Sequence, residues 1–240
     1  QDNRLAVQII GWGRNLKAWV LDYVELPGDP ANEQVWNDLT ELINRGILHE
    51  CGKTLPIIAT AIDIGGHRGE AVKSYVRKKR IRCPIAVFGS TKINAQPLSK
   101  GSMQDVTFGG RTDKKGVTIH AVGTVEIKHE IFSRLVNDAD REPDARMIRF
   151  TQELVPEYFG GLISEAYNRV KKRYEKKNEG VRNEPLDTIV YAYAALYHQS
   201  IRAHRYNDRD YERMEADIVR VDKQASFNDG KISLNNWARG

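Results

Sequence analysis

The strongest constraint on the fold is a strand–helix–strand pattern between residues 55 and 89. The stretch "LPIIATAID" (55–63) is a nearly continuous apolar run that ends in an acid, which is typical of a strand buried on both faces. A turn at Gly65-Gly66 leads into a segment with the apolar spacing of a helix, and "CPIAVFG" (83–89) predicts a second buried strand. The length of the crossover favours parallel pairing of the two strands.

The chain before this unit predicts a hairpin and a helix. Residues 5–10 and 18–26 alternate in polarity and are separated by a turn with two glycines, so they predict two antiparallel strands. An apolar stripe then predicts an amphipathic helix that ends at about Arg45. After the strand–helix–strand unit, residues 90–116 are polar and rich in glycine and lysine, which predicts a long loop or flap.

The second half predicts another strand–helix–strand unit and a final helix. Strands are expected at 116–122 and 145–150 with a helix between them, and 170–177 fits either a helix or a strand. The last helix is expected to have Pro185 in its first turn and to run to about His204. We therefore expect one α/β domain over residues 1–204, with a mixed sheet and helices on its faces. The polar residues 205–240 predict a loosely packed tail.

Composition narrows the functional classes only slightly. The formal net charge of +5 favours polyanionic partners. Cys51 and Cys83 form no CxxC pair, so neither a zinc knuckle nor a disulfide framework is indicated, and a reducing compartment is the default. No apolar run approaches the ~20 residues that span a bilayer, so no membrane partner is expected.

Three acids stand at positions where a site could form. Asp63 ends a buried strand before two glycines, and ligands of open α/β sheets lie at the carboxyl ends of strands. Glu184 and Asp187 share one face of the entrance to the last helix, beside Pro185. Each acid also has a structural interpretation, because acids favour the first turn of a helix and aspartate favours turns before glycine.

Carboxylates that converge on one point can hold Mg²⁺ through oxygen ligands. Two such ions, spaced about 4 Å apart, activate water and stabilise the leaving oxygen in phosphodiester cleavage, which requires the Asp63 and Asp187 carboxylates to lie roughly 4–7 Å apart. Spacing along the chain does not decide whether they meet.

Four stretches, in their order and spacing, give the chain a family resemblance: "QDNRLAVQIIGWG", "AWVLDYVELPGDP", "LPIIATAIDIGGH" and "RNEPLDTIVYAYAAL". Together they resemble the C-terminal nuclease domain of the large terminase subunit of lambda-type tailed bacteriophages. The resemblance covers residues 1 to about 204.

The resemblance implies an RNase H-like fold and a metal-dependent endonuclease that cuts concatemeric phage DNA during genome packaging. It implies Asp63, Asp187 and Glu184 as catalytic acids, the two aspartates as metal ligands, and Mg²⁺ or Mn²⁺, as a pair of ions, as the cofactor. The implied partners are double-stranded DNA, the terminase ATPase domain, the small subunit and the portal, in the host cell cytoplasm during phage assembly.

The chain departs from the family pattern at its first residue. The family carries an acid in an Asp-x-Gln pattern just before the opening hairpin, and Gln1 corresponds to that glutamine. The expected acid therefore lies upstream of the sequence, and Asp2 is a substitute ligand or the start of a turn. No GxxxxGK[ST] loop of a packaging motor occurs.

A basic strip lies just before the last helix, where seven basic side chains stand against Glu175 and Glu179. Such a strip is either a solvated face or a surface that attracts the DNA backbone. Its DNA-binding candidates are Lys171, Lys172, Arg173, Lys176, Lys177 and Arg182. His67, after the two glycines, is either a surface residue or one that positions phosphate or water.

Three functions compete on these observations. The first is a metal-dependent endodeoxyribonuclease. The second is a catalytically silent module that docks DNA or a packaging partner. The third is an RNase H-like nucleotidyl transferase that uses similar acids.

Overall fold

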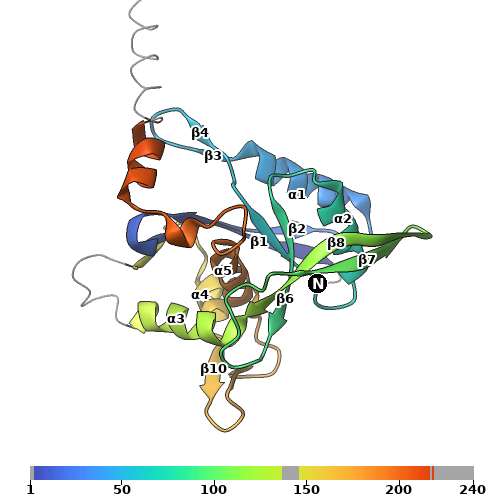
Figure 1. The fold of residues 1–240 in the computed structure, drawn as a ribbon. Helices are drawn as coiled ribbons and strands as arrows, with labels where there is room; N and C mark the ends of the chain where they lie inside the picture. Colours follow the sequence, from blue (N-terminus) through green and yellow to red (C-terminus); the bar gives the residue numbers. More distant parts are fainter. Residues whose placement is uncertain (1–2, 137–145, 217, 219–240) are drawn as a thin grey trace, which may run out of the picture.

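The computed structural model describes residues 3–136, 146–216 and 218, and it shows a mixed α/β fold (Figure 1). Two principal sheets form its centre, with strand orders β1-β2-β9 and β5-β6-β8-β7. The strands of the first sheet are β1 (Arg4–Trp12), β2 (Ala18–Pro27) and β9 (Ile148–Phe150). Those of the second are β5 (Thr60–Asp63), β6 (Pro84–Ser90), β7 (Ser102–Phe108) and β8 (Arg111–Gly123). Each sheet mixes parallel and antiparallel pairs, which confirms the expected mixed pairing. The strands of the described residues form separate sheets and not the single sheet that was expected.

Helices cover both faces of these sheets. On one side lie α1 (Glu33–Arg45) and α2 (Gly69–Lys78), and on the other lie α3 (Thr124–Val136), α4 (Pro156–Leu162) and α5 (Glu184–Ala195). Two buried clusters follow this division, because Val7, Ala86 and Ile119 pack with the first pair of helices, whereas Val20, Val87 and Val122 pack with the other three. The small hairpins β3–β4 (Ile47–Leu48, Thr54–Leu55) and β10–β11 (Glu165–Asn168, Arg173–Lys176) complete the described strands.

The predicted strand–helix–strand unit is confirmed in topology and corrected in extent. β5 and β6 pair in parallel, with Asp63 opposite Val87, and α2 connects them. The run at 55–63 is not one strand buried on both faces, because Leu55 belongs to the β3–β4 hairpin and Ile58 is 42% exposed. The apolar residues 56–59 connect the β3–β4 hairpin to strand β5.

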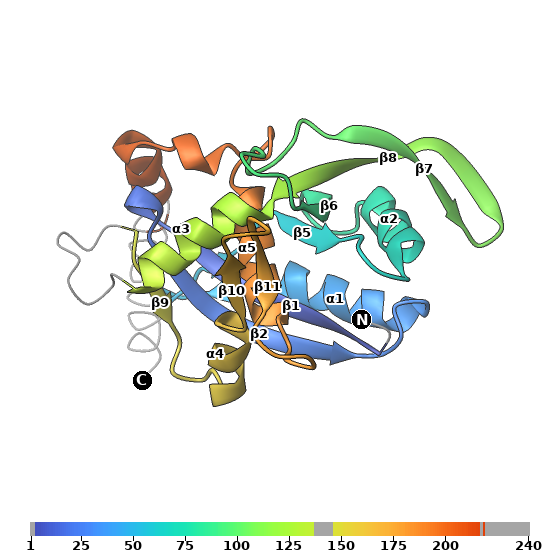
Figure 2. The same cartoon turned by 90° about the horizontal axis from the view of Figure 1, so that it is seen from below.

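Three further expectations change. Residues 90–116 are not one long loop, since β7 and β8 form a hairpin that projects from the body (Figures 1 and 2). Between residues 105 and 115, at its outer end, most side chains are exposed, so the sequence carries no alternation there. Residues 173–176 are a strand, and β9 pairs with β2 rather than with β8.

The last helix ends earlier than expected. α5 stops at Ala195, where the bonds tighten to the i+3 type, including one from the Leu196 N–H to the Tyr193 carbonyl. A 3-10 turn, η2 (Ala203–Arg205), and a helix at 208–216 follow. The Tyr211 hydroxyl donates to the Gly13 carbonyl at 2.8 Å, so this helix contacts the start of the chain. The domain boundary at 204 and the tail packing stay predictions, because most of the tail lies outside the described residues.

The two principal sheets are joined through α5, which packs on β1 and on β5 (Figure 2). The Thr188 hydroxyl donates to Gln8 of β1 at 2.5 Å, and Gln8 in turn donates to Tyr158 of α4 at 2.5 Å. β1 and β5 each have one strand neighbour among the described residues, so each leaves one edge without a strand. No helix in the described ranges has the length and apolar character needed to cross a membrane.

Candidate active site

Asp187 lies on the first turn of α5, at the junction of the two sheets. Leu186, Ile189 and Val190 are fully buried and fix the rotation of the helix in the core. Asp187 keeps 36% of its side chain exposed. The apolar stripe therefore holds the helix in place, while the acid at its entrance reaches solvent.

Asp63 ends β5 and is fixed by the turn that follows it. The Gly65 N–H donates to Asp63 Oδ1 at 2.9 Å, and a Cβ added to Gly65 would lie 3.1 Å from both carboxylate oxygens. Gly66 has a φ of +87°, which side chains other than glycine rarely adopt. The two glycines therefore let the backbone fold closely around the Asp63 carboxylate.

Tyr191, one helical turn after Asp187, lies among three acids. Its hydroxyl lies close enough to the Asp63 carboxylate for each group to shift the pKa of the other. Burial raises the pKa of Tyr191 well above its ordinary value, and the charges of Asp63, Asp187 and Glu165 raise it further. Three carboxylates from different parts of the chain thus act on one hydroxyl.

The surroundings disfavour the ionised form of both aspartates. Withdrawal from water raises the pKa of Asp63, although the Gly65 N–H and the Tyr191 hydroxyl oppose that change. It also raises the pKa of Asp187, where the Lys128 ammonium opposes the change and the Glu165 and Asp63 charges add to it. Asp63 and Asp187 therefore lie within electrostatic range of each other, while their predicted separation of roughly 4–7 Å stays a prediction.

Sequence reasoning missed Lys128 and Asn183, which hold Asp187, and Glu165, which shares both of these donors with it. The Lys128 ammonium lies 2.7 Å from Glu165 Oε2 and 3.1 Å from Asp187 Oδ1. The Asn183 amide donates to Glu165 Oε1 at 3.0 Å and to Asp187 Oδ2 at 2.8 Å. Lys128 and Glu165 keep only 9% and 6% of their side chains exposed. A lysine three residues from both Val125 and Ile131, on the buried stripe of α3, was the available signal.

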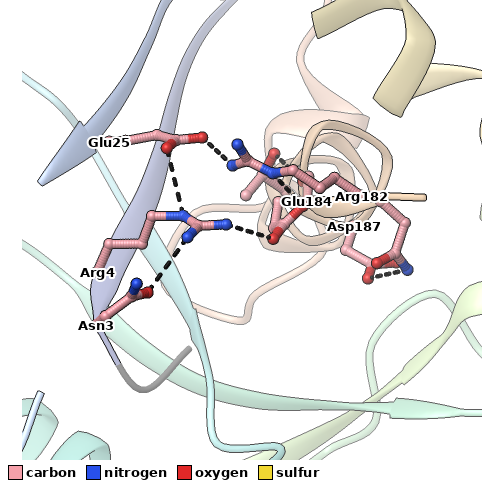
Figure 3. A network of polar contacts seen from close by, with 8 residues as sticks. Asn3, Arg4, Glu25, Arg182, Glu184 and Asp187 are labelled. Atoms are coloured by element: carbon pink, nitrogen blue, oxygen red, sulfur yellow. Dashed lines mark hydrogen bonds and ion pairs between the residues drawn. The ribbon is translucent and has the colours of Figure 1, made fainter. Parts of the chain in front are cut away.

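Glu184 belongs to a different network from Asp187. Its carboxylate lies 3.3 Å from the Arg4 guanidinium and 3.5 Å from that of Arg182, and both arginines also contact Glu25. In Figure 3 the Asp187 carboxylate lies apart from these ion pairs. The structure thus places Glu184 in contacts that tie α5 to β1 and β2.

The donor set fits a hard divalent ion only in part. Asp63 and Asp187 offer the oxygen ligands that Mg²⁺ prefers. Glu165 is already paired with a buried ammonium. Within the described ranges, no three histidine, cysteine, aspartate or glutamate side chains form a ready metal cage. Asp2 lies outside the described residues, and His67 is exposed in the turn after β5.

Most of the basic strip lies on the β10–β11 hairpin, which begins at Glu165 and projects from the body (Figure 1), while Lys177 and Arg182 follow the hairpin. Glu175 contacts Lys171 at 2.9 Å and Arg173 at 2.7 Å, and these cations lower the pKa of Glu175 to about 2. Arg182 is paired with Glu25 and Glu184. Of the six DNA-binding candidates named from the sequence, three have no acidic partner in the part of the chain that the structure describes: Lys172, Lys176 and Lys177.

A family model for the terminase large subunit gpA, endonuclease domain, matches residues 1–207. The chain therefore belongs to this family of phage endonuclease domains. It is 28% identical over 206 residues to the large terminase subunit of Enterobacteria phage P21 and 26% identical over 209 residues to that of Escherichia phage lambda. Each match covers 82% of this chain and 31% of the relative, so the chain spans about a third of those proteins. No solved structure matches it.

Proposed function

We propose that the domain is a metal-dependent endodeoxyribonuclease that cuts concatemeric phage DNA during genome packaging. The main observation behind this proposal is that Asp63, at the end of β5, and Asp187, on α5, both raise the pKa of the same Tyr191 hydroxyl. Carboxylates gathered at the carboxyl end of a parallel strand suit ligand binding. Membership of an endonuclease-domain family supports the reaction class.

We propose Mg²⁺ or Mn²⁺ as the cofactor, with Asp63 and Asp187 as its ligands. A bound ion of this kind polarises a phosphodiester and activates water for in-line attack. The chain's own contribution is to hold its ligands still: Gly65 and Tyr191 orient the Asp63 carboxylate, and Lys128 and Asn183 orient that of Asp187. His67, exposed beside Asp63, is a proposed contact to phosphate or water.

An RNase H-like fold is part of the proposal. The antiparallel β1–β2 hairpin, the parallel β5–β6 pair and a helix with an acid across them support it. By family resemblance, an upstream strand with the first acid would pair between the free edges of β1 and β5. Its acid would then lie next to Asp63. Asp2 is the alternative source of that ligand, and Glu184 is a weaker candidate because two arginines engage it.

DNA is the proposed substrate, and the β10–β11 hairpin is its proposed contact surface. The hairpin begins at Glu165 of the acidic cluster, which lies opposite Lys176 in the strand pair, so a DNA backbone held by the lysines that have no acidic partner among the described residues would pass the site. The terminase ATPase domain, small subunit and portal are the proposed partners, and the host cytoplasm during assembly is the proposed location.

One observation favours the silent docking module as a second candidate. Lys128 and Asn183 together contact all four carboxylate oxygens of Glu165 and Asp187, so the cluster is internally satisfied without metal. Nothing in the described residues favours the nucleotidyl transferase.

Nicking of supercoiled plasmid separates these candidates. We expect Mg²⁺-dependent nicking from the chain extended by its upstream strand, and loss of nicking in Asp63→Asn and Asp187→Asn. Glu70→Gln, on α2, is the matched control and should cut normally. Nicking by Asp187→Asn at the rate of the unsubstituted chain would refute the assignment of Asp187 as a metal ligand. Strand-transfer products would identify a nucleotidyl transferase.

A further inference from the structure

The buried ion pair at the proposed site bears on how many metal ions the site can take. The family resemblance implies two. The Lys128 ammonium lies between Glu165 and Asp187, close to where a cation shared by these two acids would lie. Both the lysine and the glutamate are nearly inaccessible to solvent, so solvent ions cannot easily replace the pairing.

The charges of the cluster also limit the number of divalent ions that it can bind. An isolated buried carboxylate is costly, and an ammonium in contact offsets that cost only when further hydrogen bonds complete the arrangement. Asn183 supplies those bonds to both carboxylates. Three carboxylates and one ammonium leave a net charge of −2 among these described groups, which one divalent ion neutralises.

We propose that the Lys128 ammonium takes the place of a second metal ion, so that the site binds one divalent ion, at Asp63 and Asp187. This inference rests on the proposed nuclease site. It makes Lys128 a positioning residue with a fixed charge, since it holds Asp187 towards the ion and excludes a second ion from the Glu165 side.

Counting Mn²⁺ tests the proposal. Free Mn²⁺ is measured by electron paramagnetic resonance as it is titrated into the 240-residue chain up to millimolar concentration. We expect one site in the wild-type protein. Lys128→Met keeps most of the apolar stem and removes the charge, so it should add a second site or lower the Kd at least about tenfold, because a unit charge a few ångströms away acts strongly on a divalent ion.

Two further variants keep the result interpretable. Lys73→Met removes an ammonium from an ion pair of 2.7 Å with Glu70 on α2, and it should leave the Mn²⁺ count and Kd unchanged. The double variant Lys128→Met with Glu165→Gln removes both buried charges, so it should fold and bind a single ion. If Lys128→Met is unfolded, added Mn²⁺ should restore its fold by filling the vacated position.

Several results would overturn the inference: two sites in the wild type, no Mn²⁺ binding in either protein, an unchanged count and Kd in Lys128→Met, or an unfolded Lys128→Met that Mn²⁺ does not recover. The nuclease proposal fails independently, through plasmid nicking that Asp187→Asn does not abolish or through absence of Mg²⁺-dependent nicking in the extended chain.

Discussion

Neutralising the two acids that share Lys128 should separate folding from cutting. Glu165→Gln leaves the buried ammonium with Asp187 as its remaining acidic partner, and Asp187→Asn leaves it with Glu165. Both substitutions keep the shape of the side chain. We expect the first to cost much more stability than the second, whereas the second should abolish DNA cutting.

The difference in magnitude follows from burial. Breaking a buried ion pair by removing one partner costs about 3–5 kcal/mol, and we expect the lower end for Glu165→Gln because Asp187 stays within reach of Lys128. Asp187 is 36% exposed, so its contact with Lys128 lies closer to the solvent-screened range of about 1 kcal/mol or less. For a chain of this size, about 3 kcal/mol lowers the Tm on the order of 10 °C.

Thermal and urea unfolding measured by circular dichroism give both stabilities, and nicking is measured on the extended chain. Glu175→Gln is the control, because it removes an acid from contacts with a lysine and an arginine on an exposed hairpin. Its Tm and urea midpoint should equal those of the wild type. The reasoning is refuted if Asp187→Asn is destabilised as much as Glu165→Gln.

Three more outcomes follow from the same geometry. Replacing Lys172, Lys176 and Lys177 of the hairpin by alanine should weaken DNA binding and reduce the slope of log K against log salt by about 0.9 for each phosphate that the protein no longer neutralises; an unchanged slope in a filter-binding titration would make the strip a solvated face. The raised pKa values of Asp63 and Asp187 mean that the folded state binds protons more tightly than the unfolded state, so their contribution to stability should fall as pH rises from about 4 through the raised values. Urea midpoints of the wild type and the Asp63→Asn, Asp187→Asn double variant between pH 4 and 7 check this, and a midpoint that falls equally in both would contradict it. Extending the N-terminus by the proposed upstream strand and its acid should raise Mn²⁺ affinity and Tm, while Asp→Ala in that strand alone should keep the Tm and remove cutting. Equal nicking by the 240-residue chain would make the proposed acid dispensable.

The periodic elements could be predicted because their burial leaves a mark on the sequence. The apolar stripe of α1 and the run of β6 each face the core, and both were placed within a few residues. The β7–β8 hairpin was missed because most residues of its outer end, 105–115, face solvent, so no alternation marks them. The extent of α5 was overestimated because the chain stays apolar beyond Ala195, as far as Tyr197.

The site was only partly visible for a related reason. Asp63 and Asp187 stand at an element end and a helix entrance, positions that the sequence reveals. Glu165 lies in a four-residue strand of mixed polarity, and its partner Lys128 lies 37 residues earlier, on helix α3. Such an ion pair depends on tertiary contacts, and the local sequence pattern around either residue does not predict it.

The position of α5 has a consequence for how the domain is made. This helix carries Asp187 and packs on β1, so the site joins segments that are separated by nearly the whole length of the fold. Contacts of such high sequence separation form late, and chains are synthesised from the N-terminus. A nascent chain that has not yet released α5 from the ribosome should therefore hold Asp63 without Asp187. Synthesis itself would then keep unfinished chains from cutting DNA.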